Sequence, residues 1–394
     1  MKPLLPLACL FSLLTFTAAP ARAEPPLAVP VEGATFSAEL TALDADWQIT
    51  FGSTENARQL SAGELVEWGS CAEVKRGPVA ITADGGLLVA DVIGADLDHI
   101  TLDSGLFGQV ELPLDALGGV VFDLPAGESQ RDLLLGRIAR AAGDSDRLLL
   151  QNGDEITGLI ESIDPAAVTL RTDAGTPKIE LDRIAALIFN PDLKRPPRHQ
   201  GLRVWAGFAD GSRLIATGLV VNGRVLEITA AGQTWKTLAG ELVFLQPLGG
   251  RVTYLSDLTP AAERHEPYLD LNWPAWRRDE NIAGGRLRCA GRLYLKGIGV
   301  HSYSQLTYLL DRPYRRFQAA LGIDDSTAGR GSVVFRVYVD RERTHTSNII
   351  RGGESPVPIS VDLSGAKRLD LIVDFADRAD QHDRAAWLNA RLVE

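Results

Sequence analysis

A nine-residue segment in the middle of the chain occurs twice without a gap. It reads Leu114-Asp115-Ala116-Leu117-Gly118-Gly119-Val120-Val121-Phe122 and, later, Leu181-Asp182-Arg183-Ile184-Ala185-Ala186-Leu187-Ile188-Phe189. A looser copy runs from 238 to 244. Each copy is preceded by a turn pair that favours the positive φ of tight hairpins. These pairs are Asp84-Gly85, Asn152-Gly153 and Asp210-Gly211. The pattern therefore predicts three β repeats between about residues 79 and 250.

The spacing inside the repeats supports this prediction. Two apolar residues that flank a polar one lie 16 and 18 positions after the start of each turn pair, at 100–102, 168–170 and 226–228. Apolar and polar residues alternate in Glu155–Ile163, which is typical of a half-buried strand. We expect four or five short antiparallel strands per repeat, arranged as a small SH3-like or Sm-like barrel. A propeller blade is the alternative geometry.

Two segments between the repeats lack the β pattern, and a third segment ahead of them shows it weakly. Helical spacing of Leu133, Leu134, Ile138 and Ala141 predicts a short helix over Arg131–Ala142. A Pro-rich, basic stretch around 190–199 is typical of a linker. A degenerate β repeat is expected ahead of the three clear ones.

Composition excludes several classes of protein. The chain has 394 residues with a formal net charge of −11, 45% hydrophobic and 23% charged residues, which excludes global disorder. A pI near 5.2 argues against nucleic acid as a partner, because phosphate binding requires a basic face. No stretch after residue 23 reaches the roughly 18 apolar residues of a transmembrane span.

The first 23 residues have the pattern of a signal peptide. Lys2 precedes an apolar run over Leu4–Thr17, and Ala21-Arg22-Ala23 forms a small-x-small cleavage site. We therefore expect an exported protein, with the periplasm, the cell surface and the medium left open. Removal of the leader leaves Cys71 and Cys289, for which one disulfide or two free thiols are the alternatives.

The last third of the chain has a different pattern. Segments in which apolar and polar residues alternate recur there at intervals of about 8–15 residues. This spacing indicates an antiparallel β-sandwich. Five stretches carry a further pattern: Lys296-Gly297-Ile298-Gly299-Val300-His301-Ser302, Gly322-Ile323-Asp324-Asp325, Gly331-Ser332-Val333-Val334-Phe335-Arg336-Val337, Val361-Asp362-Leu363-Ser364-Gly365-Ala366 and Asp383-Arg384-Ala385-Ala386-Trp387.

With these stretches, residues 254–394 resemble the NPCBM/NEW2 family of carbohydrate-binding modules, which are related to galactose-binding-like jelly rolls. The resemblance implies a jelly-roll sandwich and a glycan as partner, with galactose-type sugars suggested only by the fold relationship. Two residues depart from the family pattern, since Arg341 replaces a frequent glycine and Asn389 replaces a frequent acid.

Sugar recognition needs an aromatic platform for the C–H face and planar polar groups for the hydroxyls. We expect His301, Asp324 and Asp383 to line one pocket beside Trp387. Structural roles are the alternative for each of them: a satisfied buried histidine, turn caps and a core tryptophan. The full candidate set is His301, Tyr303, Asp324, Asp325, Arg336, Asp383 and Trp387.

Four carboxylates recur every three residues in the loop before Trp387, at Asp374, Asp377, Asp380 and Asp383. Oxygen ligands suit Ca²⁺, so a structural calcium site is one interpretation and a solvated acidic loop is the other. No cofactor is otherwise required.

The sequence thus predicts an all-β chain and an exported, non-catalytic carbohydrate-binding protein. Residues 24–250 show no nucleophile with a base, no metal-spaced cluster and no strand–helix alternation of a catalytic barrel, so no catalytic residue is assigned. The alternatives are an interaction scaffold with a protein partner on the β repeats and a glycoside hydrolase or its accessory part. The expected organisation is: signal peptide 1–23, degenerate repeat 24–78, repeat 79–125, helix and repeat 126–190, linker 191–202, repeat 203–250 and sandwich 251–394.

Overall fold

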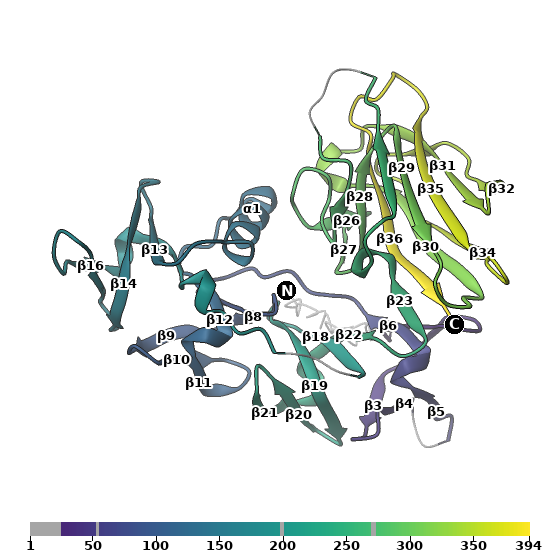
Figure 1. Cartoon of the computed structure of the whole chain (residues 1–394). Coiled ribbons are helices and arrows are strands. Elements are labelled where there is room, and N and C mark those ends of the chain that lie inside the picture. Colours follow the sequence, from purple (N-terminus) through teal and green to yellow (C-terminus); the bar gives the residue numbers. More distant parts are fainter. Residues whose placement is uncertain (1–24, 53–54, 198–200, 269–272) are drawn as a thin grey trace, which may run out of the picture.

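The computed structural model describes residues 25–52, 55–197, 201–268 and 273–394. It is built almost entirely from antiparallel strands, as Figure 1 shows. Four small β units form one part, and a two-sheet sandwich forms the other. The predicted fold class is confirmed. The predicted signal peptide lies outside the described residues.

The second unit shows the plan that all four units share. Its strands are β7 (Val79–Thr82), β8 (Leu87–Val89), β9 (Asp91–Ala95), β10 (His99–Ser104), β11 (Gly108–Pro113) and β12 (Leu117–Val121). β7 and β8 form a hairpin at the predicted turn, where Gly85 has a φ of 90°. After the 3-10 turn Leu114–Ala116, β12 returns to pair with β7. Because the last strand pairs with the first, the unit is a small barrel and not an open propeller blade.

The other three units repeat this order. The first unit has β1 (Leu27–Pro30), β2 (Phe36–Ser37), β3 (Leu40–Leu43), β4 (Gln48–Phe51), β5 (Arg58–Ser61) and β6 (Leu65–Gly69). The third has β13 (Asp146–Leu150), β14 (Glu155–Ile163), β15 (Ala167–Arg171), β16 (Lys178–Glu180) and β17 (Ile184–Ile188). The fourth has β18 (Arg203–Phe208), β19 (Arg213–Asn222), β20 (Val225–Ala230), β21 (Gln233–Leu238) and β22 (Leu242–Leu248). In each, the last strand again pairs with the first.

The units associate in two pairs through their last strands. β12 pairs antiparallel with β17, and β6 pairs with β22. Val120 lies opposite Leu187 in the first pairing, and Trp68 lies opposite Leu245 in the second. All four residues are the fourth of their strands. Both pairings therefore use one register, and a single hydrophobic cluster extends through all four units.

Helix α1 (Glu128–Ala139) lies between the second and third units along the chain and begins three residues before the predicted helix. Its buried Leu135 and Ile138 pack on the apolar outer face of the strands β7, β12 and β17. The predicted linker forms a 3-10 turn at Pro191–Leu193, where the side chain of Asn190 accepts a hydrogen bond from the Asp192 amide at 3.0 Å.

The sandwich consists of two sheets around one core. One sheet has the order β25-β28-β36-β30-β34, with β23 also paired to β36, and the other β24-β29-β35-β31-β32, with β33 paired to β31. A separate hairpin, β26 with β27, lies beside them. The bounds are β23 (Val252–Tyr254), β24 (Ala262–His265), β25 (Arg277–Arg278), β26 (Leu287–Cys289), β27 (Arg292–Tyr294), β28 (Gly297–His301), β29 (Ser304–Leu309), β30 (Arg316–Ile323), β31 (Ser332–Val339), β32 (Glu342–Thr346), β33 (Ile350–Arg351), β34 (Val357–Asp362), β35 (Arg368–Phe375) and β36 (Arg384–Val393).

The sandwich contacts the units through buried polar groups. Asn389 of β36 donates to the carboxylate of Glu67 on β6 at 2.9 Å and accepts from the Gln246 amide on β22 at 3.0 Å. Glu67 also pairs with Arg292 at 2.6 Å. Since Glu67 and Gln246 lie on the paired strands β6 and β22, the sandwich is anchored where the first and fourth units meet.

Two further findings concern the cysteines and the membrane. Cys71 and Cys289 are both buried and free, so the disulfide alternative is wrong for this structure. Within the described ranges, no helix is long and apolar enough to cross a membrane.

The seam between β12 and β17 gives a stability prediction. A Cβ on Gly119 would lie 2.1 Å from the Leu187 carbonyl oxygen and 2.8 Å from Ile138, whereas on the neighbouring Gly118 it would meet nothing closer than 3.7 Å. We expect Gly119→Ala to lower the free energy of unfolding by about 1–3 kcal/mol. Gly118→Ala should change it by less than about 1 kcal/mol. Chemical denaturation of both variants measures the two free energies of unfolding. Equal losses in the two variants would contradict the close contact between Gly119 and Leu187 in the β12–β17 pairing.

Candidate functional site

The predicted stacking platform is a core residue. Trp387 on β36 has an exposed fraction of 0% and packs edge-on against Phe335, with ring centroids 4.8 Å apart. Phe317 of β30 lies on another side at 6.0 Å. An aromatic ring fully covered by the core offers no face to a sugar, so the structure contradicts the expected stacking role. The alternative, a core tryptophan, is correct.

His301 and Asp383 are buried together at one end of the sandwich. Asp383 accepts hydrogen bonds from the Ser302 hydroxyl at 2.7 Å and from the Ser332 amide at 2.9 Å. Burial raises the pKa of Asp383 to about 6, although the hydrogen bonds from these two donors lower it. The His301 ring stacks on Trp273 at 5.8 Å, and burial lowers its pKa. Both residues thus hold loops in place.

Asp324 and Asp325 hold the β26–β27 hairpin. Asp324 accepts from the side-chain amide of Asn281 and from the backbone amide of Arg288, both at 3.0 Å, and burial raises its pKa. Asp325 accepts from the amides of Ala290 and Gly291 at 3.0 and 2.8 Å. The predicted pair therefore acts as a turn cap and hairpin anchor, which is one of the sequence-based alternatives.

Arg336 lies on the other sheet, and Tyr303 lies next to Ser302 in the turn that joins β28 to β29. Arg336 of β31 forms an ion pair with Asp374 of β35. Tyr303, just before β29, lies under the Arg264 guanidinium at 5.7 Å. The structure thus divides the seven predicted residues among a core position, a buried loop cluster, a hairpin anchor and a sheet face. It does not bring His301, Asp324 and Asp383 into one pocket.

The four carboxylates of the acidic loop have separate partners. Asp374 pairs with Arg336, Asp377 pairs with Arg351 at 2.7 Å, and Asp380 accepts from the Tyr268 amide at 2.8 Å. In the described part of the chain, no three His, Cys, Asp or Glu side chains form a group that could hold a metal ion. The geometry therefore gives no support to the calcium interpretation.

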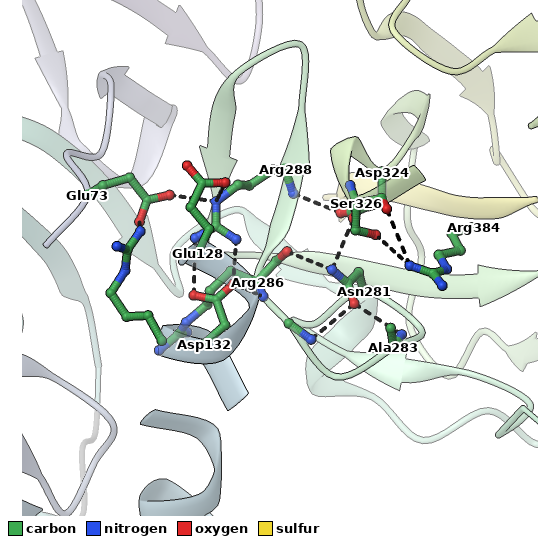
Figure 2. A network of polar contacts seen from close by, with 12 residues as sticks. Glu73, Glu128, Asp132, Asn281, Ala283, Arg286, Arg288, Asp324, Ser326 and Arg384 are labelled. Atoms are coloured by element: carbon green, nitrogen blue, oxygen red, sulfur yellow. Dashed lines mark hydrogen bonds and ion pairs between the residues drawn. The ribbon is translucent and has the colours of Figure 1, made fainter. Parts of the chain in front are cut away.

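A pocket of about 340 Å³ opens where helix α1 meets the sandwich; we call it the junction pocket. Figure 2 shows the polar network around it. The helix contributes Glu128, Ser129, Asp132 and Leu133. The sandwich contributes Asp324, Asp325, Ser326 and Arg384, together with Arg288 and the loop that contains Asn281. Among the predicted residues, only Asp324 and Asp325 line it.

Arg384 is the residue that the sequence-based candidate set missed. Its guanidinium lies over the Trp273 ring at 5.4 Å, and its Nη1 is 3.3 Å from the Ser326 hydroxyl. It therefore connects the aromatic cluster around His301 with the junction pocket. Its position inside the Asp383–Trp387 motif is the sequence signal for it, and the two predicted residues of that motif, Asp383 and Trp387, are both buried.

A larger groove of about 900 Å³ lies between the second and third units. Its walls include the exposed Leu97 and Leu193 and several aspartates, among them Asp98 and Asp173. The groove carries none of the predicted sugar-binding residues.

Comparison with known proteins identifies the C-terminal third. Residues 251–393 match the family model described as the NPCBM/NEW2 domain, which confirms the resemblance seen in the sequence. A protein of Renibacterium salmoninarum that bears the name "Putative endo-alpha-N-acetylgalactosaminidase" is 34% identical over 110 residues, 28% of this chain and 7% of that protein. Alpha-1,3-galactosidase B of Akkermansia muciniphila is 31% identical over 117 residues, 29% of this chain and 15% of that protein. The chain thus spans a small part of either relative.

Two solved structures from Clostridium perfringens are also similar. CBM51 of GH95, in complex with methyl-galactose, shares 27% identity with a TM-score of 0.32, covering 36% of this chain and 99% of that chain. The CBM51-2 and INT domains of ZmpB share 25% identity with a TM-score of 0.34, covering 49% of this chain and 40% of that chain.

Asp383 gives a pH prediction. Its pKa is about 6 in the folded chain against an ordinary value of 3.8, so the folded state binds more protons between about pH 4 and 6. This carboxyl therefore lowers the stability of the fold as the pH rises through that window, by up to about 3 kcal/mol. Asp383→Asn keeps an oxygen for the Ser332 amide and removes the charge.

We expect the free energy of unfolding of Asp383→Asn, minus that of the wild type, to increase between pH 4 and pH 7. Urea denaturation at both pH values measures this difference. A difference that does not change with pH would show that the carboxyl titrates normally.

Proposed function

We propose that the chain is an exported, non-catalytic carbohydrate-binding protein that binds a glycan at the loop end of its sandwich. The observation that carries this proposal is the match of residues 251–393 to the NPCBM/NEW2 model. Both curated relatives are named for enzymes that act on galactose or N-acetylgalactosamine linkages. A galactose-type sugar is therefore the ligand we propose.

The loop end offers groups that suit this ligand. Arg384 presents a planar guanidinium whose Nη1 lies 3.4 and 3.3 Å from the carbonyl and hydroxyl oxygens of Ser326. Such a group can donate to two sugar hydroxyls at once. Trp273 is partly exposed beside it, with the His301 ring stacked on it and the Arg384 guanidinium over it, and its exposed part adds an apolar contact surface. Arg384 and Trp273 replace the buried Trp387 as the candidate contacts.

Absence of catalysis is part of the proposal. Glycoside hydrolysis needs two carboxyl groups about 5–10 Å apart across an open cleft. In the sandwich, Asp324 and Asp383 are buried and hold backbone amides. Export rests on the predicted leader, and the periplasm, the cell surface and the medium are the alternative compartments.

A second candidate function is an interaction scaffold. Two observations favour it: most predicted sugar ligands have structural roles, and the units carry a groove of about 900 Å³ with exposed leucines. In that case the sandwich would bind no glycan, and a protein partner would bind the β units.

The binding test uses the purified full chain on a glycan array, followed by calorimetry with the best glycan. We expect Arg384→Ala to weaken binding about tenfold or more, because a charged hydrogen bond contributes about 1.5–3 kcal/mol. Arg343→Ala on the edge strand β32 makes the same charge change away from the loop end and serves as the control. Absence of binding to every glycan would favour the scaffold.

The catalytic test measures release of reducing sugar from galactose-containing glycans. We expect none above a heat-denatured control. Turnover that disappears in an aspartate-to-asparagine variant of this chain would show that it is an enzyme.

A further inference from the structure

Helix α1 belongs to the N-terminal β units by sequence and packing, yet it forms one wall of the junction pocket. Its first turn places Glu128 and Ser129 at the pocket, and Leu133 follows one turn later. The opposite wall comes from the sandwich residues Asp325 and Arg384. The pocket therefore exists only where the two parts of the chain meet.

The helix is held firmly at this place. Both carboxylate oxygens of Asp132 accept from the guanidinium of Arg288 on β26, and one of them also accepts from the Arg286 amide at 2.8 Å. Arg288 pairs in addition with Glu73 at 2.6 Å. Asp132 and Arg288 are both buried. A buried ion pair with these further hydrogen bonds fixes the orientation of helix α1. Separating the two charges is costly, because each would then be buried with neither water nor an opposite charge beside it.

The pocket combines the chemistry that a sugar requires. Arg384, Ser129 and Ser326 can donate hydrogen bonds, and Glu128 and Asp325 can accept them. Leu133 is 50% exposed, which leaves an apolar surface for C–H groups. Acidic side chains outnumber basic ones in the lining, which disfavours anionic ligands such as uronic acids. The volume of about 340 Å³ is at the small end for ligand sites.

We infer that helix α1 completes the sugar-binding site, and that the ligand is a single neutral sugar unit held between the helix and the sandwich. This inference rests on the proposed function and adds that the isolated sandwich has an incomplete site. The β units then contribute directly to recognition and do not act only as a spacer.

The test compares two bulky substitutions on adjacent, exposed helix positions in the full chain. Ser129→Trp fills the pocket, and Gln130→Trp places the same side chain outside it. The probes are methyl galactoside, N-acetylgalactosamine and galacturonic acid, titrated calorimetrically. We expect the wild type and Gln130→Trp to bind one of the neutral probes, galacturonic acid not to bind, and Ser129→Trp to bind at least about tenfold more weakly.

Two alanine substitutions on the same helix keep the test decisive if a tryptophan variant fails to fold. Glu128→Ala removes one acceptor from the wall and should weaken binding several-fold, whereas Arg137→Ala, which removes the helix's ion pair with Glu155 of β14, should not. Unchanged binding in both Ser129→Trp and Glu128→Ala overturns the role of the helix and leaves the proposed function intact. Failure of the wild type to bind any neutral sugar on the array overturns both.

Discussion

In each small barrel the last strand pairs with the first along one edge and leaves its other edge open, and pairing of these open edges is the constraint on which the structure depends. An unpaired edge presents backbone donors and acceptors to any other chain. Here β12 pairs with β17 and β6 pairs with β22 at the same register. Each pairing joins two units into a continuous sheet, and the resulting core is larger than one unit could form alone.

The pairing of β6 with β22 also determines where the sandwich sits. Glu67 and Gln246, from the two strands of one seam, are buried and would be costly without partners. Asn389 and Arg292 of the sandwich supply those partners. Asn389 replaces a frequent acid of the family pattern. An acid at that position would bring a second carboxylate against Glu67, so the asparagine is explained by the contact with the units.

Helix α1 forms a second connection between the two parts. Its Asp132 binds Arg288, whose backbone amide is in turn bound by Asp324. Asp324 thus lines the junction pocket and also holds the hairpin that carries Arg288. Figure 2 shows these contacts together with the contact between Ser326 and Arg384, the first residue of β36. The site that we propose is consequently a product of two parts that are distant in the sequence.

The sequence by itself determined the elements of this protein. Period-two alternation in Glu155–Ile163 and the Gly-containing turn pairs identified strands and hairpins, because these signals depend on residues close in the chain. It also identified the sandwich through motifs such as Gly297–Ser302. Only the tertiary structure decided which motif residues face solvent. Asp383, Arg384 and Trp387 lie within five positions, yet one is buried under a loop, one is at a pocket and one is in the core. A strand end and its loop leave the sheet at angles that depend on distant packing partners, here Phe335, Trp273 and helix α1, and no local pattern encodes those partners.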